Sequence, residues 1–196
     1  MRVPLRMSDE QAHKILNDKR IWVERKLEEG RLARQRVEPL RRLTHVMIFG
    51  RLKEVIFDAV KKPTLQEDKL ILPLRFDGNE KAIVRIIKKL LKGFAKDYLT
   101  AELIKKPYAH RGFTLSNART KWASCSADNR MQFNWRIACL PPILINYLMV
   151  HEMCHTIHHN HSSAYWLLVA SHVPNHKTLR KQLKDYSELT QLYRDK

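Results

Sequence analysis

The stretch His151-Glu152-Met153-Cys154-His155, followed closely by His161, gathers the side chains of this chain that are best suited to chemistry. Four residues of an α-helix advance about 400°, so His151 and His155 lie about 40° apart on one face, one turn from each other. Two imidazoles placed in this way can bind one metal ion, and Glu152 can take a proton from a water molecule held there. The pattern predicts a metal site with a general base.

His161 follows His155 at the spacing of the third ligand in metzincin sites, just before another predicted helix. Metzincins carry a glycine where this chain has His158, so the chain does not fit that group. Two helical histidines, His161 and a water molecule would give Zn2+ the three protein ligands and open position that are typical of catalytic zinc. We therefore predict Zn2+ on His151, His155 and His161.

Other donors near the motif are expected to have structural roles. His158 and His159 fit a hydrated helix end, where the helix dipole favours a cation. Cys154 points to a different helix face from the histidines and is predicted to lie in the core. Together with Cys125 and Cys139 it forms an odd set without a C-x-x-C pair, which indicates free thiols in a reducing, cytoplasmic location.

The motif ends an apolar run that is predicted to form a buried helix. Pro141 and Pro142 open this helix at positions where proline is tolerated, and the residues that follow up to Val150 are mostly apolar. His151 and Glu152 then lie at the inner end of a core helix, where burial is costly unless something pairs with them. A metal ion would meet this requirement.

Six short segments rich in β-branched and aromatic residues are predicted to be strands. They span residues 44–49, 52–57, 69–74, 113–116, 121–126 and 131–137. The last two form a hairpin just before the motif, and a long amphipathic helix runs from Glu80 to about Lys105. Two further helices follow the motif, the first starting near Ser162 and closed by Pro174, the second reaching about Leu192. This segregated order predicts an α+β fold with a small antiparallel or mixed sheet packed on the motif helix and the C-terminal helices.

Residues 1–40 are predicted to be a basic helical segment packed on a main domain of residues 41–196. Ser8 and Gln11 form a capping box at the start of an amphipathic helix. Gly30 offers a stop, and Pro39 is expected to end the segment because proline lacks an amide donor.

Composition sets limits on the class of protein. The chain has 196 residues, 44% of them hydrophobic, which fits one globular core. No apolar run reaches the roughly 18 residues of a membrane span, so no membrane partner is expected. The net charge of +17 is spread along the chain. Both solvated basic helix faces and a surface for a polyanion such as nucleic acid fit this distribution.

Further motifs occur in order over residues 110–180. They are Arg119-x-Lys121-Trp122-Ala123-Ser124-Cys125-Ser126, Phe133-Asn134-Trp135-Arg136, Tyr147, the H-E-x-x-H stretch, Asn160-His161-Ser162 and Tyr165-Trp166. Together they resemble the YgjP-like metallopeptidase domain, a small zincin family related in its active-site helix to the gluzincin and SprT-like groups. The resemblance implies a zincin-like, minigluzincin-type fold, Zn2+ on the three histidines, and Glu152 as general base and acid.

The chain departs from the family pattern in two places. Lys121 and Ala123 stand where the family has arginine and glycine, which changes the hydrogen-bond donors and the backbone freedom at this point. The basic hairpin that usually starts the family domain is shortened here to Val3-Pro4-Leu5.

The first function that follows is a zinc-dependent hydrolase, a metallopeptidase whose extended peptide substrate pairs with the edge of a strand from the 131–137 hairpin. The second is hydrolysis of a nucleotide phosphoanhydride, since some members of the resembling family are annotated UTP pyrophosphatases. Arg119, Lys121 and Arg136 would then contact phosphates, with Asn134 as a further substrate contact. The third is a nucleic-acid-associated domain with a structural zinc, or a protease tethered to nucleic acid through its basic surface.

Overall fold

The computed structural model describes residues 8–105 and 111–193, and the chain divides into two compact units, residues 1–36 and 37–196. The described part of the first unit is helical. α1 (Asp9–Asp18) starts at Ser8, whose hydroxyl accepts a hydrogen bond from the Gln11 amide at 3.3 Å, and Gln11 completes the predicted capping box. The shortened start at residues 3–5 lies outside the described residues.

α2 (Arg20–Arg41) continues through both positions at which the sequence predicted a stop. Gly30 lies within the helix, and Pro39 lies in its last turn. Proline removes only one backbone donor, so the helix runs two residues beyond it before Leu43 turns the chain with a φ of 58°. The packing of residues 1–40 on the rest of the chain stays a prediction.

The second unit contains two small sheets, which confirms a mixed α+β class. The first sheet has the order β1 (His45–Ile48), β2 (Arg51–Asp58), β4 (Lys69–Pro73) and β3 (Thr64–Leu65), with β2 and β4 parallel. The second has the order β5 (Phe113–Ser116), β7 (Met131–Asn134) and β6 (Ala123–Cys125), with β5 and β7 parallel. The predicted hairpin is formed by β6 and β7, which are antiparallel.

β7 differs from the predicted strand in two ways. It ends at Asn134, and residues 135–139 form the 3-10 helix η2 (Trp135–Cys139) because the Asn134 side chain accepts a hydrogen bond from the Arg136 amide at 3.0 Å. It is also the middle strand, with β5 on one side and β6 on the other. Both edges of β7 are already paired, so of the two strands of the predicted hairpin it is β6 that lies at the edge of the sheet, where a peptide could pair.

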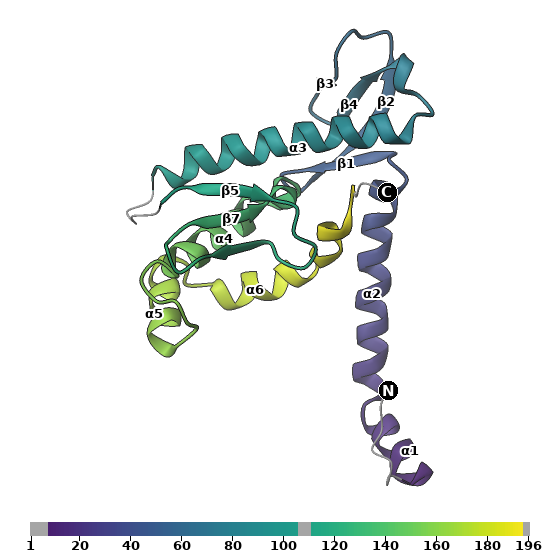
Figure 1. Cartoon of the computed structure of the whole chain (residues 1–196). Coiled ribbons are helices and arrows are strands. Elements are labelled where there is room, and N and C mark those ends of the chain that lie inside the picture. The colour runs from purple at the N-terminus through teal and green to yellow at the C-terminus, as the bar shows by residue number, and fades with distance from the viewer. Residues whose placement is uncertain (1–7, 106–110, 194–196) are drawn as a thin grey trace. The chain divides into compact units, whose positions relative to one another are not determined.

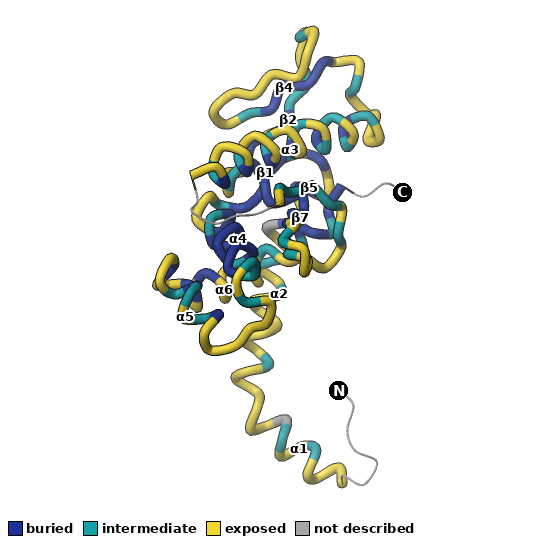
Figure 2. The backbone as a smooth tube through the Cα atoms, turned by 60° about the vertical axis from the view of Figure 1, so that its left-hand side comes forward, coloured by how far each residue is buried: buried dark blue, intermediate teal, exposed yellow. Residues whose placement is uncertain are grey.

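Helices enclose the second sheet. α3 (Glu80–Leu103) runs along one side of it, and α5 (Ser163–His172) and α6 (His176–Lys184) lie on the other side (Figures 1 and 2). α4 (Pro142–Cys154) is buried over most of its length, as Figure 2 shows. The last predicted helix ends early, and a separate 3-10 helix, η3 (Ser187–Gln191), follows it. No helix within the described ranges is long and apolar enough to cross a bilayer.

The turn between β1 and β2 fixes the start of α4. Gly50 has a φ of +79°, and a Cβ atom there would lie 2.8 Å from Cγ of Pro141, the residue that caps α4. The backbone amides of Phe49 and Gly50 donate to the carbonyls of Ala138 and Cys139 at 2.7 and 3.1 Å. A side chain does not fit at position 50, so the first sheet and the start of α4 are held in close contact.

Candidate metal centre

α4 positions the first two histidines of the motif. His151 lies in its last turn, and His155 is the C-cap residue with φ −69° and ψ −17°. Since these angles are still helical, the two rings keep the one-turn spacing expected from the sequence, and their centroids are 5.1 Å apart. The helix therefore presents both imidazoles to the same point.

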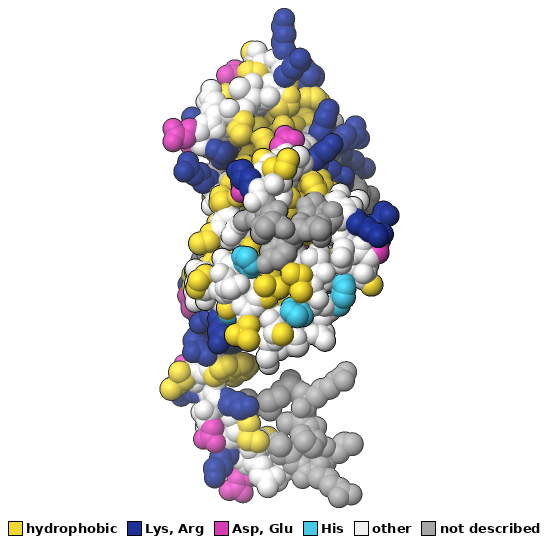
Figure 3. All heavy atoms as spheres, turned by 90° about the vertical axis from the view of Figure 1, so that its left-hand side faces the viewer, with side chains coloured by type: hydrophobic (Ala, Val, Ile, Leu, Met, Phe, Trp, Pro, Cys, Tyr) yellow, Lys and Arg dark blue, Asp and Glu magenta, His cyan; other side chains and the backbone are white. Residues whose placement is uncertain are grey.

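A short turn after α4 brings His161 to that point. Its Nε2 lies 3.3 Å from Nε2 of His151, and one ligand atom from each of the three histidines lies within 4.8 Å of the others. The chain then enters α5, because the Ser162 hydroxyl accepts a hydrogen bond from the Tyr165 amide at 3.4 Å. The exposed face in Figure 3 shows histidine side chains among hydrophobic ones.

The second nitrogen of His155 is fixed by the same turn. Nδ1 of His155 lies 3.0 Å from the carbonyl oxygen of His158, so the Nδ1–H group donates to this carbonyl and Nε2 keeps its lone pair. A histidine that binds a metal usually donates its other N–H group in this way, which fixes its tautomer and orientation. His158 thus takes part through its backbone, while the His159 side chain is exposed.

The surroundings of His151 and His155 favour neutral rings. Burial lowers the pKa of His151 to about 3, helped by its neighbours His155 and His161. Burial also lowers the pKa of His155. Nδ1 of His151 is buried without a hydrogen-bond partner among the described residues. Neutral imidazoles are the form that binds metals, so this part of the chain is prepared for an ion rather than for protons.

The separation of two of the three histidine nitrogens matches a zinc site. Two nitrogens bound to one tetrahedral Zn2+ at about 2.0–2.1 Å lie roughly 3.3 Å apart. The two Nε2 atoms of His151 and His161 have this separation, 3.3 Å. Two unprotonated nitrogens at such a distance repel each other unless a proton or cation lies between them. The three histidines fit Zn2+ in their chemistry, and the His151–His161 pair also fits it in its spacing.

Glu152 is the buried acid of the motif. Only 4% of its surface is exposed, and burial raises the pKa of its carboxyl to about 7, while the positive charge of Lys121 acts in the opposite direction. Glu152 in turn contributes, after burial, to raising the pKa of the Cys125 thiol in β6. The carboxyl group therefore lies within electrostatic range of the β6 end of the second sheet, and it can both take up and release a proton near neutral pH.

Two consecutive aromatic residues of α5 support the histidines, and sequence reasoning had not given them this role. The Tyr165 ring stacks on His155 with centroids 4.5 Å apart, and its hydroxyl donates to the His151 carbonyl at 3.0 Å. The Trp166 ring stacks on His161 at 5.4 Å. In the sequence, the signal for this role was an aromatic pair in the first turn after the Ser162 cap. At this place in α5 both rings face back toward the motif.

The four predicted substrate contacts fall into two pairs. Arg119 and Lys121 are exposed on the loop before β6. Asn134 and Arg136 are 0% and 1% exposed and serve the fold instead, which corrects their prediction as substrate contacts. Their side chains are used by hydrogen bonds inside the protein, as described below, so neither is presented to a ligand.

Asn134 and Arg136 hold neighbouring segments in place. Nδ2 of Asn134 donates to the carbonyls of Ala118 and Lys121 at 2.7 and 3.2 Å. The Arg136 guanidinium donates to the Leu192 carbonyl at 2.7 Å and to the Asn117 side chain at 2.8 Å, and it lies 4.1 Å from the Trp135 ring. Cys154 is 0% exposed, as predicted for a core residue.

Comparison with known proteins agrees with this site. The family model of the YgjP-like metallopeptidase domain matches residues 1–186. Neither the curated proteins nor the solved structures contained a match. A match over nearly the whole chain, with a cluster of three histidines in the described part, indicates a metal-dependent hydrolase. The chain belongs to the YgjP-like metallopeptidase domain family.

Proposed function

We propose that the protein is a zinc-dependent peptidase with a zincin-like, minigluzincin-type active site. The observation that carries the proposal is the convergence of His151, His155 and His161 on one point, with the buried carboxyl group of Glu152 on the same helix. The group found within the described residues has three histidine ligands, and three protein ligands are typical of catalytic zinc.

His151, His155 and His161 would hold the ion. When bound, Zn2+ acts as a Lewis acid that lowers the pKa of water and polarises a carbonyl group. The Nδ1–H bond of His155 to the His158 carbonyl and the stacking of Tyr165 on its ring keep this histidine oriented.

Glu152 would move the proton. Its carboxylate takes a proton from the attacking water and returns it to the leaving amine nitrogen. A pKa of about 7 suits both steps, because general acid–base catalysis is most effective when the pKa lies near the working pH. Burial, the first cause of this pKa, also keeps bulk water away from the transferred proton.

β6 is the best candidate to hold a peptide. It is an edge strand of the second sheet and packs next to α4. An extended peptide pairing with this edge would lie beside the motif helix, as in β-strand addition. Ile157 and Leu167, which flank His161 in sequence, are 51% and 72% exposed and offer apolar surface for peptide side chains.

The proposal is tested with three purified proteins: wild type, Glu152→Gln and His161→Ala. Elemental analysis should find one zinc per chain in the first two and a large loss in the third. A peptide library analysed by mass spectrometry should be cleaved by wild type, with a loss of about 100-fold or more in Glu152→Gln. Equal zinc in all three proteins would remove His161 from the ligand set, and equal cleavage would remove Glu152 as the base.

A second candidate function is hydrolysis of a nucleotide phosphoanhydride. It is favoured by a pocket of about 500 Å3 whose lining includes Arg111, Lys121 and Arg130, although Arg130 is paired with Asp128 at 2.8 Å. Lys121 would contact a phosphate close to Glu152. Pyrophosphate release from UTP by wild type but not by Glu152→Gln would select this reaction, and intact UTP after long incubation with the zinc-loaded protein would exclude it.

A nucleic-acid-associated domain with structural zinc is the weaker candidate. The histidine group in the described residues has three members, whereas structural zinc sites usually have four protein ligands. A protease tethered to nucleic acid stays a prediction from the net charge of +17. Its affinity for nucleic acid should fall steeply with salt concentration, because released counterions drive such binding.

A further inference from the structure

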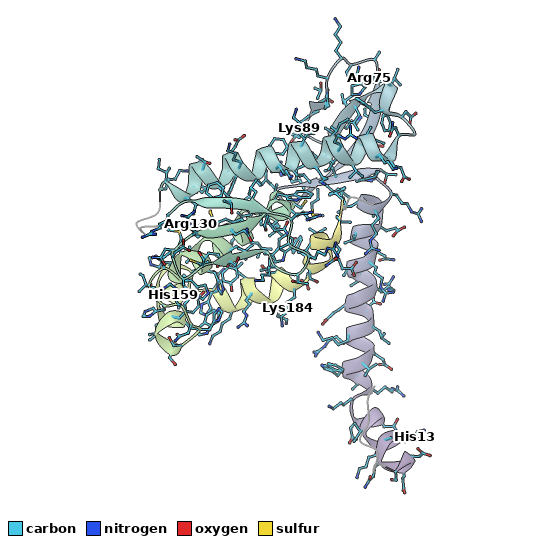
Figure 4. All side chains as sticks on the ribbon, viewed as in Figure 1. His13, Arg75, Lys89, Arg130, His159 and Lys184 are labelled. Atoms are coloured by element: carbon cyan, nitrogen blue, oxygen red, sulfur yellow. The ribbon has the colours of Figure 1, made fainter. Side chains whose placement is uncertain are left out.

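A second pocket, with a volume of about 570 Å3, opens between the loop that carries Arg119 and the C-terminal elements α6 and η3. Trp122, which is 9% exposed, and Leu183 provide apolar lining. Arg119, Arg180 and Lys184 also line it, and Figure 4 shows Lys184 on α6. The volume lies in the usual range for sites that bind small molecules.

The charge of this pocket is positive. Its one acidic residue is Glu188, and the Glu188 carboxylate is already engaged by the Arg41 guanidinium at 3.0 Å. Arg119, Arg180 and Lys184 form no ion pair with any residue of the described ranges. Three cations around an apolar wall raise the local concentration of anions, because little in the pocket offsets their field.

The pocket walls are held in position by hydrogen bonds. The side chains of Thr190 and Gln191 both donate to the Arg119 carbonyl, which ties η3 to the loop. The Asn134 side chain donates to two other carbonyls of the same loop. The Arg136 side chain donates to the carbonyl of Leu192, the residue after η3. Asn134 and Arg136, the two buried residues first expected to touch substrate, thus support the walls of this pocket from the protein interior. A pocket fixed in this way loses little entropy on binding a ligand.

Arg180 links the pocket to the metal centre. Its guanidinium lies 5.1 Å from the Trp166 ring, and this ring stacks on His161. The planar guanidinium forms paired hydrogen bonds with carboxylate and phosphate groups. A ligand held by Arg180 would therefore lie on the Trp166 side of the three histidines.

We propose that this pocket binds a small anionic ligand. Its carboxylate or phosphate group would be held by Arg119, Arg180 and Lys184, and its apolar or planar body would lie against Trp122. Binding at this site does not depend on turnover, so it can be present or absent whether or not the protein is a peptidase.

The test is isothermal titration calorimetry of the full chain with three probes that share a phenyl ring and differ in the group attached to it: phenyl phosphate, phenylacetate and phenol. The pocket variant is Arg119→Gln with Lys184→Gln. The control is Arg85→Gln with Lys181→Gln, which removes the same charge from exposed positions on α3 and α6 outside the pocket. Thermal melts verify that each variant folds, and every titration is repeated after zinc removal with a chelator.

At least one anionic probe should bind wild type and the control equally and bind the pocket variant about tenfold more weakly or worse. Phenol should not bind. Comparison of the two anions then assigns the pocket to phosphates or to carboxylates. Three results would overturn the proposal: no binding of either anion, equal weakening in both variants, or binding that disappears with zinc and is unaffected in the pocket variant.

Discussion

Arg136 and Glu152 are two buried charged residues with opposite surroundings. Arg136 donates hydrogen bonds to a carbonyl and to an amide side chain and lies on the Trp135 ring. Glu152 has a pKa raised by burial and stands next to His151, whose Nδ1 atom lacks a partner among the described residues. Removing a buried charge that is well bonded leaves its partners unsatisfied and destabilises a fold, whereas a buried group with a strongly shifted pKa is a candidate for a functional site.

The largest effect should come from removing the well-bonded charge. Arg136→Met removes the side-chain donor of the Leu192 carbonyl and one of the two donors of the Asn117 side chain, which keeps the Trp135 indole N–H. We expect the free energy of unfolding to fall by about 4 kcal/mol, since each hydrogen bond to a charged group contributes about 2 kcal/mol. Urea unfolding measures this change. The exposed control Arg85→Met should change stability by less than about 0.5 kcal/mol. Equal stability of the two variants would mean that Arg136 is not a structural residue.

In the metal-free protein Glu152→Gln should raise the free energy of unfolding, whereas Arg136→Met lowers it. The folded-state pKa of about 7 lies above the ordinary value of 4.5, so the proton is bound more tightly in the folded state. Glu152 therefore lowers stability progressively as the pH rises from 4.5 to 7, and the full loss is present above pH 7. The free energy of unfolding of Glu152→Gln should exceed that of wild type by about 2 kcal/mol more at pH 8 than at pH 5.

Urea unfolding of the metal-free proteins at the two pH values checks this expectation. Glu54→Gln, a change at an exposed carboxyl in β2, serves as the control and should show no such difference between the two pH values. If Glu152→Gln behaves like Glu54→Gln, the contrast between Arg136 and Glu152 fails.

The contrast also shows which features the sequence could predict. Helical periodicity was enough for α3, and the proline pair with the apolar run that follows it was enough for α4. The spacing of His151 and His155 placed two imidazoles together, because it follows from local helix geometry. Residue type alone could not tell that Asn134 and Arg136 bond to backbone carbonyls, since an exposed and a buried arginine look alike in sequence. The partners of Arg136 lie 19 and 56 residues away, and no local pattern encodes them.

Trp166→Ala should weaken zinc binding without removing it. The ring stacks on His161, the most exposed of the three histidines, and residues that orient a ligand typically change metal affinity by about tenfold or more. Competition with a chelator measures the affinity. Trp166→Phe should restore most of it, and Leu167→Ala, next to it in sequence, should have no effect. The same loss in Leu167→Ala would show that α5 acts as a whole and that Trp166 has no separate role.

The smallest effect is expected for Tyr165→Phe. This change removes the hydroxyl that donates to the His151 carbonyl but keeps the ring that stacks on His155. Stability should fall by about 1 kcal/mol, the usual net contribution of one hydrogen bond. Thermal melts of the zinc-loaded protein test it. A loss as large as that of Arg136→Met would place Tyr165 among the residues on which the fold depends.

The close contact of Gly50 with Pro141 has a consequence for genetic screens. α4 is a rigid rod, and His151 lies about 14 Å along its axis from Pro142. Any side chain at position 50 must push Pro141 away or strain a backbone with positive φ, and the rod carries this displacement to the histidines. In a saturation-mutagenesis experiment scored by growth or activity, position 50 should tolerate as few substitutions as the histidines themselves, although it provides no atom for the chemistry.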